Sequence, residues 1–160
     1  MRDVALRALK ICLVSLLLSV PAAGLACSKF PQPELPRYPL RIVTAGGPLT
    51  IQAEFARTAE QRNCGLMGRA RLADGTGMLF DMRPAGPAHF WMKNTPEPLD
   101  ILFFDPQGWL VYLVRNARPH SEQTVGTNQP VAAVLELAAG EAARLGLGAG
   151  TRVRLPWLGQ

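Results

Sequence analysis

The residues best suited to do chemistry lie in one short stretch, HFWMKNTPEPLD, at positions 89–100. Its candidate side chains are Trp91, Lys93, Asn94, Thr95 and Asp100. A lysine beside a carboxylate can form an ion pair, or one of the two groups can become a general base when burial shifts its pKa. A lysine with amide and hydroxyl neighbours can also bind an anionic or polyhydroxylated ligand beside an aromatic ring. The stretch therefore allows a binding cleft, or a hydrolase or lyase built from the same polar cluster.

The local fold of this stretch decides between a structural and a functional role. If residues 89–93 pair with residues 100–104 as a hairpin, Lys93 lies opposite Asp100. The two would then form a cross-strand ion pair, with polar side chains capping the loop. In the alternative interpretation, the same side chains line a ligand site. Strand alternation would turn Trp91 toward solvent or a cleft and its immediate neighbours toward the core.

Two further candidates, Arg62 and Arg69, flank the sequence CGLM and are separated by about two helical turns. On one side of a helix they could form an anion site. The alternative is ordinary pairing with strand-end carbonyls or with carboxylates such as Asp81 or Asp100.

Other kinds of site have weak support in the sequence. The histidines are His89 and His120, and neither a His-x-His nor a Cys-x-x-Cys pair occurs, so we expect no metal site. No Gly-x-Ser-x-Gly elbow or phosphate-binding glycine loop is present, and no cofactor is expected. Cys64 with either histidine is the remaining nucleophilic pair. A buried or disulfide-bonded cysteine is the more ordinary state.

The N-terminal residues 1–26 are typical of a signal peptide. Three basic residues precede the apolar run ICLVSLLLSV, which is too short to span a bilayer that requires about 20 helical residues. The sequence thus predicts export to the periplasm or the extracellular space. Cleavage before Cys27 changes the formal charge from +5 to +3, because three basic residues and one acid are removed. With no Lys/Arg run, a nucleic-acid partner is not expected.

Cys27 has two mutually exclusive predicted fates. GLAC at residues 24–27 resembles a lipobox, so Cys27 could carry a lipid anchor. Alternatively, in an oxidising compartment, Cys27 could pair with Cys64.

The rest of the chain is predicted to form one β domain. Residues 27–39 are rich in proline and are expected to be extended, and residues 40–160 form a single domain. Short β-branched and aromatic runs occur at residues 40–44, 49–55, 77–82, 89–93, 99–105, 109–115, 131–137 and 151–155. Glycine and proline separate these runs, which predicts an all-β, jelly-roll-like antiparallel sandwich or barrel.

Turn and capping signals interrupt the strand pattern. Residues 105–108, DPQG, are typical of a type I turn and predict a hairpin. Thr58 and Gln61 have the spacing of a capping box, so a short helix should begin at residue 59. A second short helix is predicted at residues 141–145, where Gly146 would end it.

The longer motifs carry a family resemblance. RNCGLMGR at residues 62–69, GTGMLF at 75–80, HFWMKNT at 89–95, PLDILF at 98–103 and VLELAAG at 134–140 are similar to the domain-of-unknown-function family 192. The resemblance spans about residues 40–155. It implies a jelly-roll-like β-sandwich, often exported, with no activity to carry over. The family pattern includes Arg62, Arg69, Lys93, Asp100 and Glu136, but not Cys64 or His89.

These observations predict an exported, monomeric, all-β domain without catalytic activity. We expect it to bind a small polar or anionic ligand, a glycan or an envelope partner. The predicted cleft contains Arg62, Arg69, Trp91, Lys93, Asn94, Thr95 and Asp100. A hydrolase or lyase using the same cluster, and a purely structural envelope component, are the alternatives.

Overall fold

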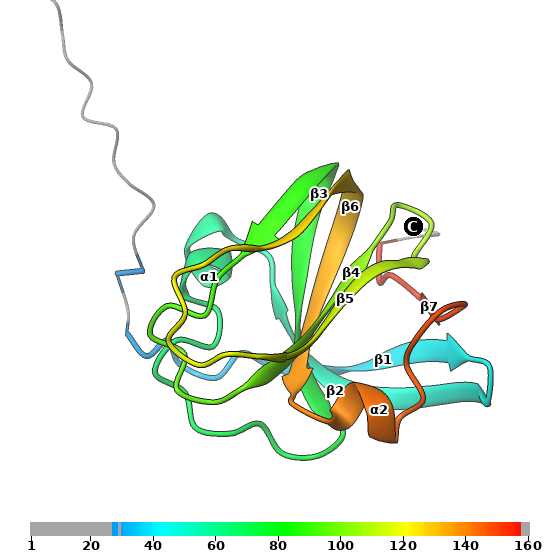
Figure 1. Ribbon diagram of the computed structural model, residues 1–160, viewed down its shortest axis with the longest axis horizontal. Coiled ribbons are helices and arrows are strands. Elements are labelled where there is room, and N and C mark those ends of the chain that lie inside the picture. Colours follow the sequence, from blue (N-terminus) through cyan, green and yellow to red (C-terminus); the bar gives the residue numbers. More distant parts are fainter. Residues whose placement is uncertain (1–26, 29, 158–160) are drawn as a thin grey trace, which may run out of the picture.

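The computed structural model describes residues 27, 28 and 30–157 (Figure 1). The predicted signal peptide lies outside these residues. The helices and strands are β1 (Arg37–Thr44), β2 (Gly47–Ala56), α1 (Ala59–Cys64), β3 (Thr76–Phe90), β4 (Leu99–Phe104), β5 (Leu110–Ala117), β6 (Val125–Ala138), α2 (Glu141–Arg144) and β7 (Arg152–Val153). The predicted all-β class with short helices is confirmed. The predicted run 77–82 and the first two residues of the run 89–93 lie on the single strand β3, whereas residues 91–93 belong to the loop that follows.

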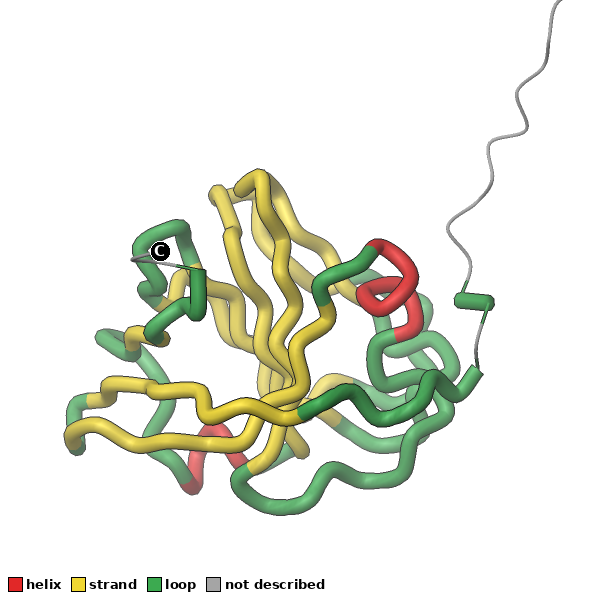
Figure 2. Tube along the Cα trace, turned by 180° about the vertical axis from the view of Figure 1, so that it is seen from behind, coloured by secondary structure: helices red, strands yellow, loops and turns green. Residues whose placement is uncertain are grey.

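The strands form one curled sheet in the order β5-β4-β6-β3-β2-β1-β7. Figures 1 and 2 show the sheet bending into a half-barrel. The edge strands β5 and β7 approach each other at one corner. There the amide of Leu110, the first residue of β5, donates to the carbonyl of Thr151, just before β7, at 2.9 Å. The sheet was expected to be antiparallel throughout, but β2 and β3 pair in parallel. Parallel neighbours require a crossover connection, and the segment containing α1 provides it.

The predicted hairpin between residues 89–93 and 100–104 is wrong. Strand β6 lies between β3 and β4 and pairs with both of them. Residues 131–138 of β6 are all buried, as expected for a central strand with both faces covered. Strand β3 ends at Phe90, and two prolines remove amide donors from the loop that follows.

The local signals correctly predicted the turn and the helix start. The Gly108 amide donates to the Asp105 carbonyl at 2.9 Å and closes the turn between β4 and β5. At α1, the Gln61 amide donates to the Thr58 hydroxyl, and the Gln61 side chain accepts from the Thr58 amide. These reciprocal bonds form the predicted capping box.

Two groups of buried apolar side chains lie on opposite faces of the sheet. The Leu135 cluster includes Leu137 and Ala142 of α2. The Phe80 cluster includes Val134 and Ala138 of β6. Alternation along β6 explains the division, because successive side chains of a strand point to opposite faces. Residue 136 therefore faces the Phe80 cluster.

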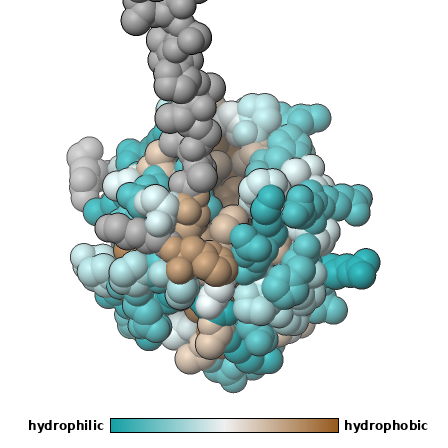
Figure 3. All heavy atoms as spheres, turned by 90° about the vertical axis from the view of Figure 1, so that its left-hand side faces the viewer, coloured by the Kyte–Doolittle hydropathy of each residue, from teal (hydrophilic) through white to brown (hydrophobic). Residues whose placement is uncertain are grey.

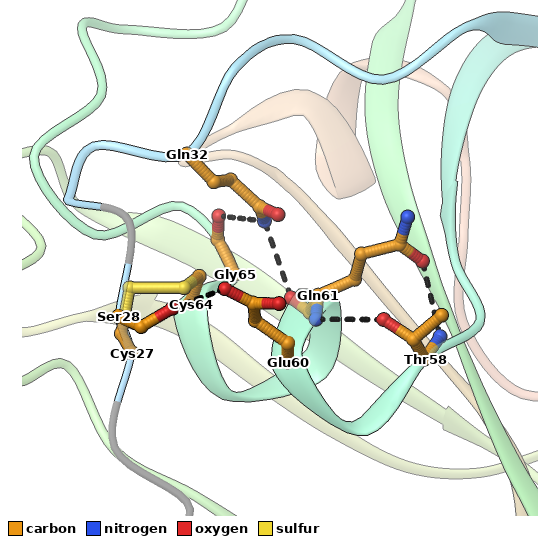
Figure 4. The surroundings of a disulfide bond; sticks show 8 residues. All are labelled: Cys27, Ser28, Gln32, Thr58, Glu60, Gln61, Cys64 and Gly65. Atoms are coloured by element: carbon orange, nitrogen blue, oxygen red, sulfur yellow. Dashed lines mark hydrogen bonds between the residues drawn. A yellow bond between two sulfur atoms is a disulfide. The ribbon is translucent and has the colours of Figure 1, made fainter.

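The N-terminal segment is fastened to α1, as Figure 4 shows. A disulfide joins Cys27 to Cys64, the last residue of α1. The Gln32 side-chain amide donates to the Gly65 carbonyl at 2.7 Å and to the Gln61 carbonyl at 3.2 Å. Of the two alternatives for Cys27, the structure thus contains the disulfide.

Removing this disulfide should lower the stability. We expect Cys27→Ala with Cys64→Ala to lower the free energy of unfolding by about 2–4 kcal/mol, because the unfolded chain regains the freedom of a long loop. The cross-linked residues are 37 positions apart. Urea unfolding with and without reductant measures the effect. Reductant should destabilise the wild type and leave the double variant unchanged; equal sensitivity of both proteins would contradict this assignment.

Candidate functional site

A cleft of about 670 Å³ opens beside α1. The N-terminal segment, the end of α1, β3, the loop after β3 and β6 all contribute to its lining. Its apolar lining consists of Phe30, Leu66, Met67, Phe80, Met82, Phe90, Trp91 and the Cys27–Cys64 disulfide, and its polar lining includes Arg62, Asn63, His89, Lys93, Asn94, Thr95 and Glu136. Figure 3 views the molecule from the side of α1 and shows apolar residues gathered at the centre of this face, among hydrophilic ones. Such a mixture of apolar walls and few polar groups is typical of small-molecule sites.

Glu136 is the buried acid of the cleft, with a relative exposure of 5%. It lies in register with Met78 of β3 and Ile101 of β4, so apolar residues flank it on both sides. Among the described residues, no group forms a hydrogen bond or an ion pair with its carboxyl group. Every fully enclosed side-chain oxygen or nitrogen in the described part of the chain has a hydrogen-bond partner. The Glu136 carboxyl oxygens have none, so they are not fully enclosed, and they open into the cleft that Glu136 lines.

The surroundings of Glu136 favour its neutral form. Burial without a compensating charge raises the pKa of Glu136 to about 8. Most copies of the free protein therefore carry a protonated Glu136 at neutral pH. A protonated carboxyl group can donate one hydrogen bond and still accept others.

The loop after β3 places Lys93 and Asn94 at the solvent-exposed edge of the cleft, the rim, whereas Thr95 is buried. Met92 is buried and anchors the loop, and its amide donates to the Ser121 carbonyl at 2.9 Å. Asn94 adopts a left-handed backbone with φ 55°, which asparagine tolerates better than most residues. Its carbonyl accepts from the Gly68 amide at 2.8 Å, which ties the loop to the segment after α1.

The rim carries positive charge beside an exposed aromatic ring. The Lys93 ammonium lies 5.2 Å from the centre of the Trp91 ring. It also lies 3.6 Å from a carboxylate oxygen of Glu122, in a solvent-exposed pair that contributes little to stability. Arg62 is the second cationic residue in the lining, and one of its guanidinium nitrogens donates to the Arg57 carbonyl at 2.7 Å.

Arg69 does not line the cleft. Its guanidinium forms two bonds to the Glu54 carboxylate, at 2.6 and 3.0 Å, and both side chains are buried. The expected alternative, pairing with a carboxylate, is confirmed for this arginine, with Glu54 as the partner. A buried bidentate pair of this kind holds β2 to the segment after α1.

Asp100 does not line the cleft either, and the expected Lys93–Asp100 pair is wrong. The Asp100 carboxylate accepts hydrogen bonds from the backbone amides of Asn116, Gly140 and Ala142, at 2.9, 3.0 and 2.9 Å. It is almost fully buried and joins β4 to the end of β5 and to the start of α2. Its role in this geometry is structural.

The fold and these motifs agree with one protein family. The model of DUF192, described as Uncharacterized ACR, COG1430, matches residues 41–155. The chain belongs to this family. No curated protein is similar enough to the chain to match it.

Two solved structures are similar to this DUF192 protein. A protein of unknown function from Novosphingobium aromaticivorans DSM 12444 is 37% identical, with a TM-score of 0.71, and the match covers 74% of this chain and 85% of that one. A protein from Sinorhizobium meliloti 1021, whose name proposes a transcription regulator, is 41% identical, with a TM-score of 0.72. That match covers 76% of this chain and 95% of the other.

The DUF192 cleft brings together part of the predicted set and adds one residue. Arg62, Trp91, Lys93, Asn94 and Thr95 share its lining. Glu136 belonged to the family pattern but was not among the candidate site residues. Its signal in the sequence is a single acid inside the apolar run VAAVLELA, because a strand buried on both faces has little reason to contain a carboxyl group.

Two further findings concern metal ligands and the cysteine sulfur in this part of the DUF192 chain. Among residues 27, 28 and 30–157, no group of three or more His, Cys, Asp or Glu side chains could hold a metal ion. The Cys64 sulfur is in the disulfide, so it provides no thiolate in this state.

No helix within residues 27, 28 and 30–157 is long and apolar enough to cross a membrane.

Proposed function

We propose that this DUF192 protein binds a small amphipathic ligand in the cleft and performs no reaction on it. The main observation in support is the Glu136 carboxyl group, which faces a cleft of about 670 Å³ among apolar side chains. This volume lies within the range of about 300–1,000 Å³ that is usual for ligand sites. The ligand would place an apolar part against Phe80, Met82 and Phe90, and a polar group against Glu136.

The charges of the rim support an anionic group on the ligand. Arg62 and Lys93 are both in the lining, and the one acid there, Glu136, is held largely neutral by the raised pKa. The lining residues therefore carry a positive balance near neutral pH. The Glu122 carboxylate, 3.6 Å from the Lys93 ammonium, offsets part of that charge from outside the lining. Asn94 and Trp91 add a hydrogen-bonding side chain and an exposed ring for further contacts.

A hydrolase or lyase is the second candidate. One observation favours it: a carboxyl group with a raised pKa in a cleft is suited to general acid–base catalysis. The expected general bases were Lys93 and Asp100, but Asp100 accepts three backbone amides outside the cleft and the Lys93 side chain is 40% exposed. No nucleophile paired with a base is found in the described residues. Turnover of an amphipathic ester or amide that disappears in Glu136→Gln would favour this second candidate over pure binding.

Export also remains our proposal. The Cys27–Cys64 disulfide supports it, because such bonds persist in oxidising compartments. A disulfide at Cys27 leaves no thiol for a lipid. The mass of the protein isolated from cells would decide, since a lipid adduct on Cys27 would contradict this assignment.

The binding proposal can be tested with a matched pair of tryptophans. Trp91 and Trp109 are 44% and 45% exposed, and each ring has a cation near its face, Lys93 at 5.2 Å and Arg152 at 5.0 Å. Only the first pair lines the cleft. The probe is anilinonaphthalene sulfonate, an amphipathic anion whose fluorescence rises in apolar sites.

We expect Trp91→Ala and Lys93→Met each to weaken probe binding about tenfold, which corresponds to about 1.4 kcal/mol. Trp109→Ala and Arg152→Met should leave the affinity unchanged. Lys93→Met should also keep the free energy of unfolding within about 0.5 kcal/mol of wild type, because its ion pair is exposed. Absence of binding, or equal losses in both pairs of variants, would remove the support for a cleft ligand.

A further inference from the structure

We propose that the ligand is bipolar, with a protonated amine bound by Glu136 in the cleft and an anionic group held at the rim by Arg62 and Lys93. This inference rests on the proposed binding function and specifies the ligand class. The observation behind it is that the acid in the lining is buried, with Glu136 5% exposed, whereas the Lys93 side chain of the same lining is 40% exposed.

Glu136 differs from every other buried carboxyl group in residues 27, 28 and 30–157. The buried acids are Glu54, Asp100, Glu136 and Glu141. Glu54 is bound by Arg69, and Asp100 accepts three backbone amides. Glu141 is bound by Arg144 at 2.6 Å and by the Gly75 amide at 3.0 Å. The fold thus provides a cationic or amide donor for each buried acid except the one that opens into the cleft.

The missing partner of Glu136 is best provided by a cation. Hydrogen bonds between an ammonium and a carboxylate are roughly twice as strong as neutral ones. The aromatic walls suit the same group, because ammonium ions are attracted to the faces of aromatic rings. Phe80 and Phe90 pack edge to face at 5.1 Å, and both line the cleft with Trp91. An ammonium next to Glu136 would therefore bind a carboxylate in a cleft that aromatic side chains help to line.

A simple amine does not suit the rest of the lining. Arg62 and Lys93 would repel a ligand whose only charge is positive, whereas a second, anionic group turns that repulsion into attraction. The apolar side chains of the lining, Met82 among them, suit a hydrocarbon spacer. A compound with an amine at one end and a carboxylate or other anion at the other end satisfies all three regions.

Proton release distinguishes this ligand from a neutral one. Because the pKa of Glu136 is raised to about 8 in the free protein, an ammonium must displace its proton at pH 7. About one proton should be released for each amine bound. A hydroxyl or carbonyl group would leave Glu136 protonated. The other titratable groups lining the cleft are Arg62, His89 and Lys93. His89→Asn is therefore the control for protons exchanged by the imidazole.

The experiment is calorimetric titration of the full protein with aminohexanoate, hexanoate, hexylamine and hexanol, and with their butyl and octyl counterparts. Buffers with different ionisation enthalpies give the number of protons released. We expect the amino acid of suitable length to bind about tenfold tighter than the matched anion or amine, with close to one proton released. Glu136→Gln should remove this advantage and the proton release, but should leave binding of the matched anion unchanged. His89→Asn should retain both effects.

Two results would overturn the inference in different ways. If the plain anion or the alcohol binds as tightly as the amino acid and no proton is released, the ligand is not an amine, although the proposed binding function stands. If none of these compounds and no probe binds the cleft, the proposed function fails as well.

Discussion

Replacing Glu136 with glutamine is expected to make the protein progressively more stable than wild type as the pH rises from about 5 to 8, by about 4 kcal/mol in total. Burial raises the pKa of this group from the ordinary value of 4.5 to about 8. The difference corresponds to roughly 4–5 kcal/mol, because one pKa unit is worth about 1.4 kcal/mol. Glutamine has nearly the same shape and no charge, so this cost is absent from the variant.

The direction follows from the protons bound in each state. In the unfolded chain Glu136 loses its proton near its ordinary pKa, whereas in the folded protein it keeps the proton until the pH approaches 8. Between these values the folded state binds more protons, so the wild-type free energy of unfolding falls as the pH rises. Below the unfolded pKa both states are protonated, and wild type and variant should run parallel.

Urea unfolding at several pH values between 4 and 9 would measure this difference. Glu122→Gln is the control, because that side chain is 66% exposed and its replacement should change the free energy of unfolding little. Glu141 affects the free energy of unfolding in another pH range. The side-chain hydrogen bonds from Arg144 lower its pKa, so its contribution is lost only in acid and is common to both proteins. Parallel curves for wild type and Glu136→Gln across the whole range would contradict a buried, neutral Glu136.

This prediction also separates function from stability. A group that destabilises the fold and has no structural partner is typical of a functional site, where stability is exchanged for activity or binding. Glu136→Gln should thus stabilise the protein above pH 5 and weaken its binding of amines. A residue that merely filled the core would not combine these two effects.

Asp100→Ala is expected to destabilise the protein by about 4 kcal/mol or more. The substitution leaves three backbone amides without their acceptor, and each unsatisfied buried donor costs about 1–3 kcal/mol. The three bonds are 2.9–3.0 Å long and come from residues 116, 140 and 142, so they join three separate parts of the chain. Loss of the carboxylate should loosen α2 and the end of β5 together.

Asp100→Asn tests the geometry further. One carboxylate oxygen accepts from Asn116 and the other from Gly140 and Ala142, whereas asparagine keeps only one oxygen. Its amide nitrogen would face a backbone donor, so this variant should also lose stability. Asp74→Ala is the control, because its carboxylate is 70% exposed. Equal denaturation midpoints for Asp100→Ala and Asp74→Ala would contradict the structural role.

The sequence predicted those features that depend on neighbours along the chain. Thr58 and Gln61 form their capping box within one helical turn, and Asp105 and Gly108 close a turn of four residues. Each signal needs only a few adjacent residues, so the sequence contains all the information for it. The β-rich runs predicted the class of the fold for the same reason.

The position of β6 was the main feature that the sequence left open. The run at 131–137 was predicted as a strand, but its insertion between β3 and β4 depends on pairing between segments far apart in the chain. That insertion separated Lys93 from Asp100 and made the expected ion pair impossible. Arg69 shows the same limit, because its partner Glu54 lies on β2, 15 residues earlier in the chain.

The sequence by itself determined the strand-rich class, the turn at residues 105–108 and the capping box of α1. Only the tertiary structure decided which polar groups meet and which remain open. Arg69 and Asp100 found buried partners, whereas Glu136 faces the cleft without one. The physical reason is that the charged state and the role of a carboxyl group depend on burial and on the donors within a few ångströms. Those donors come from segments that only the folded sheet brings together.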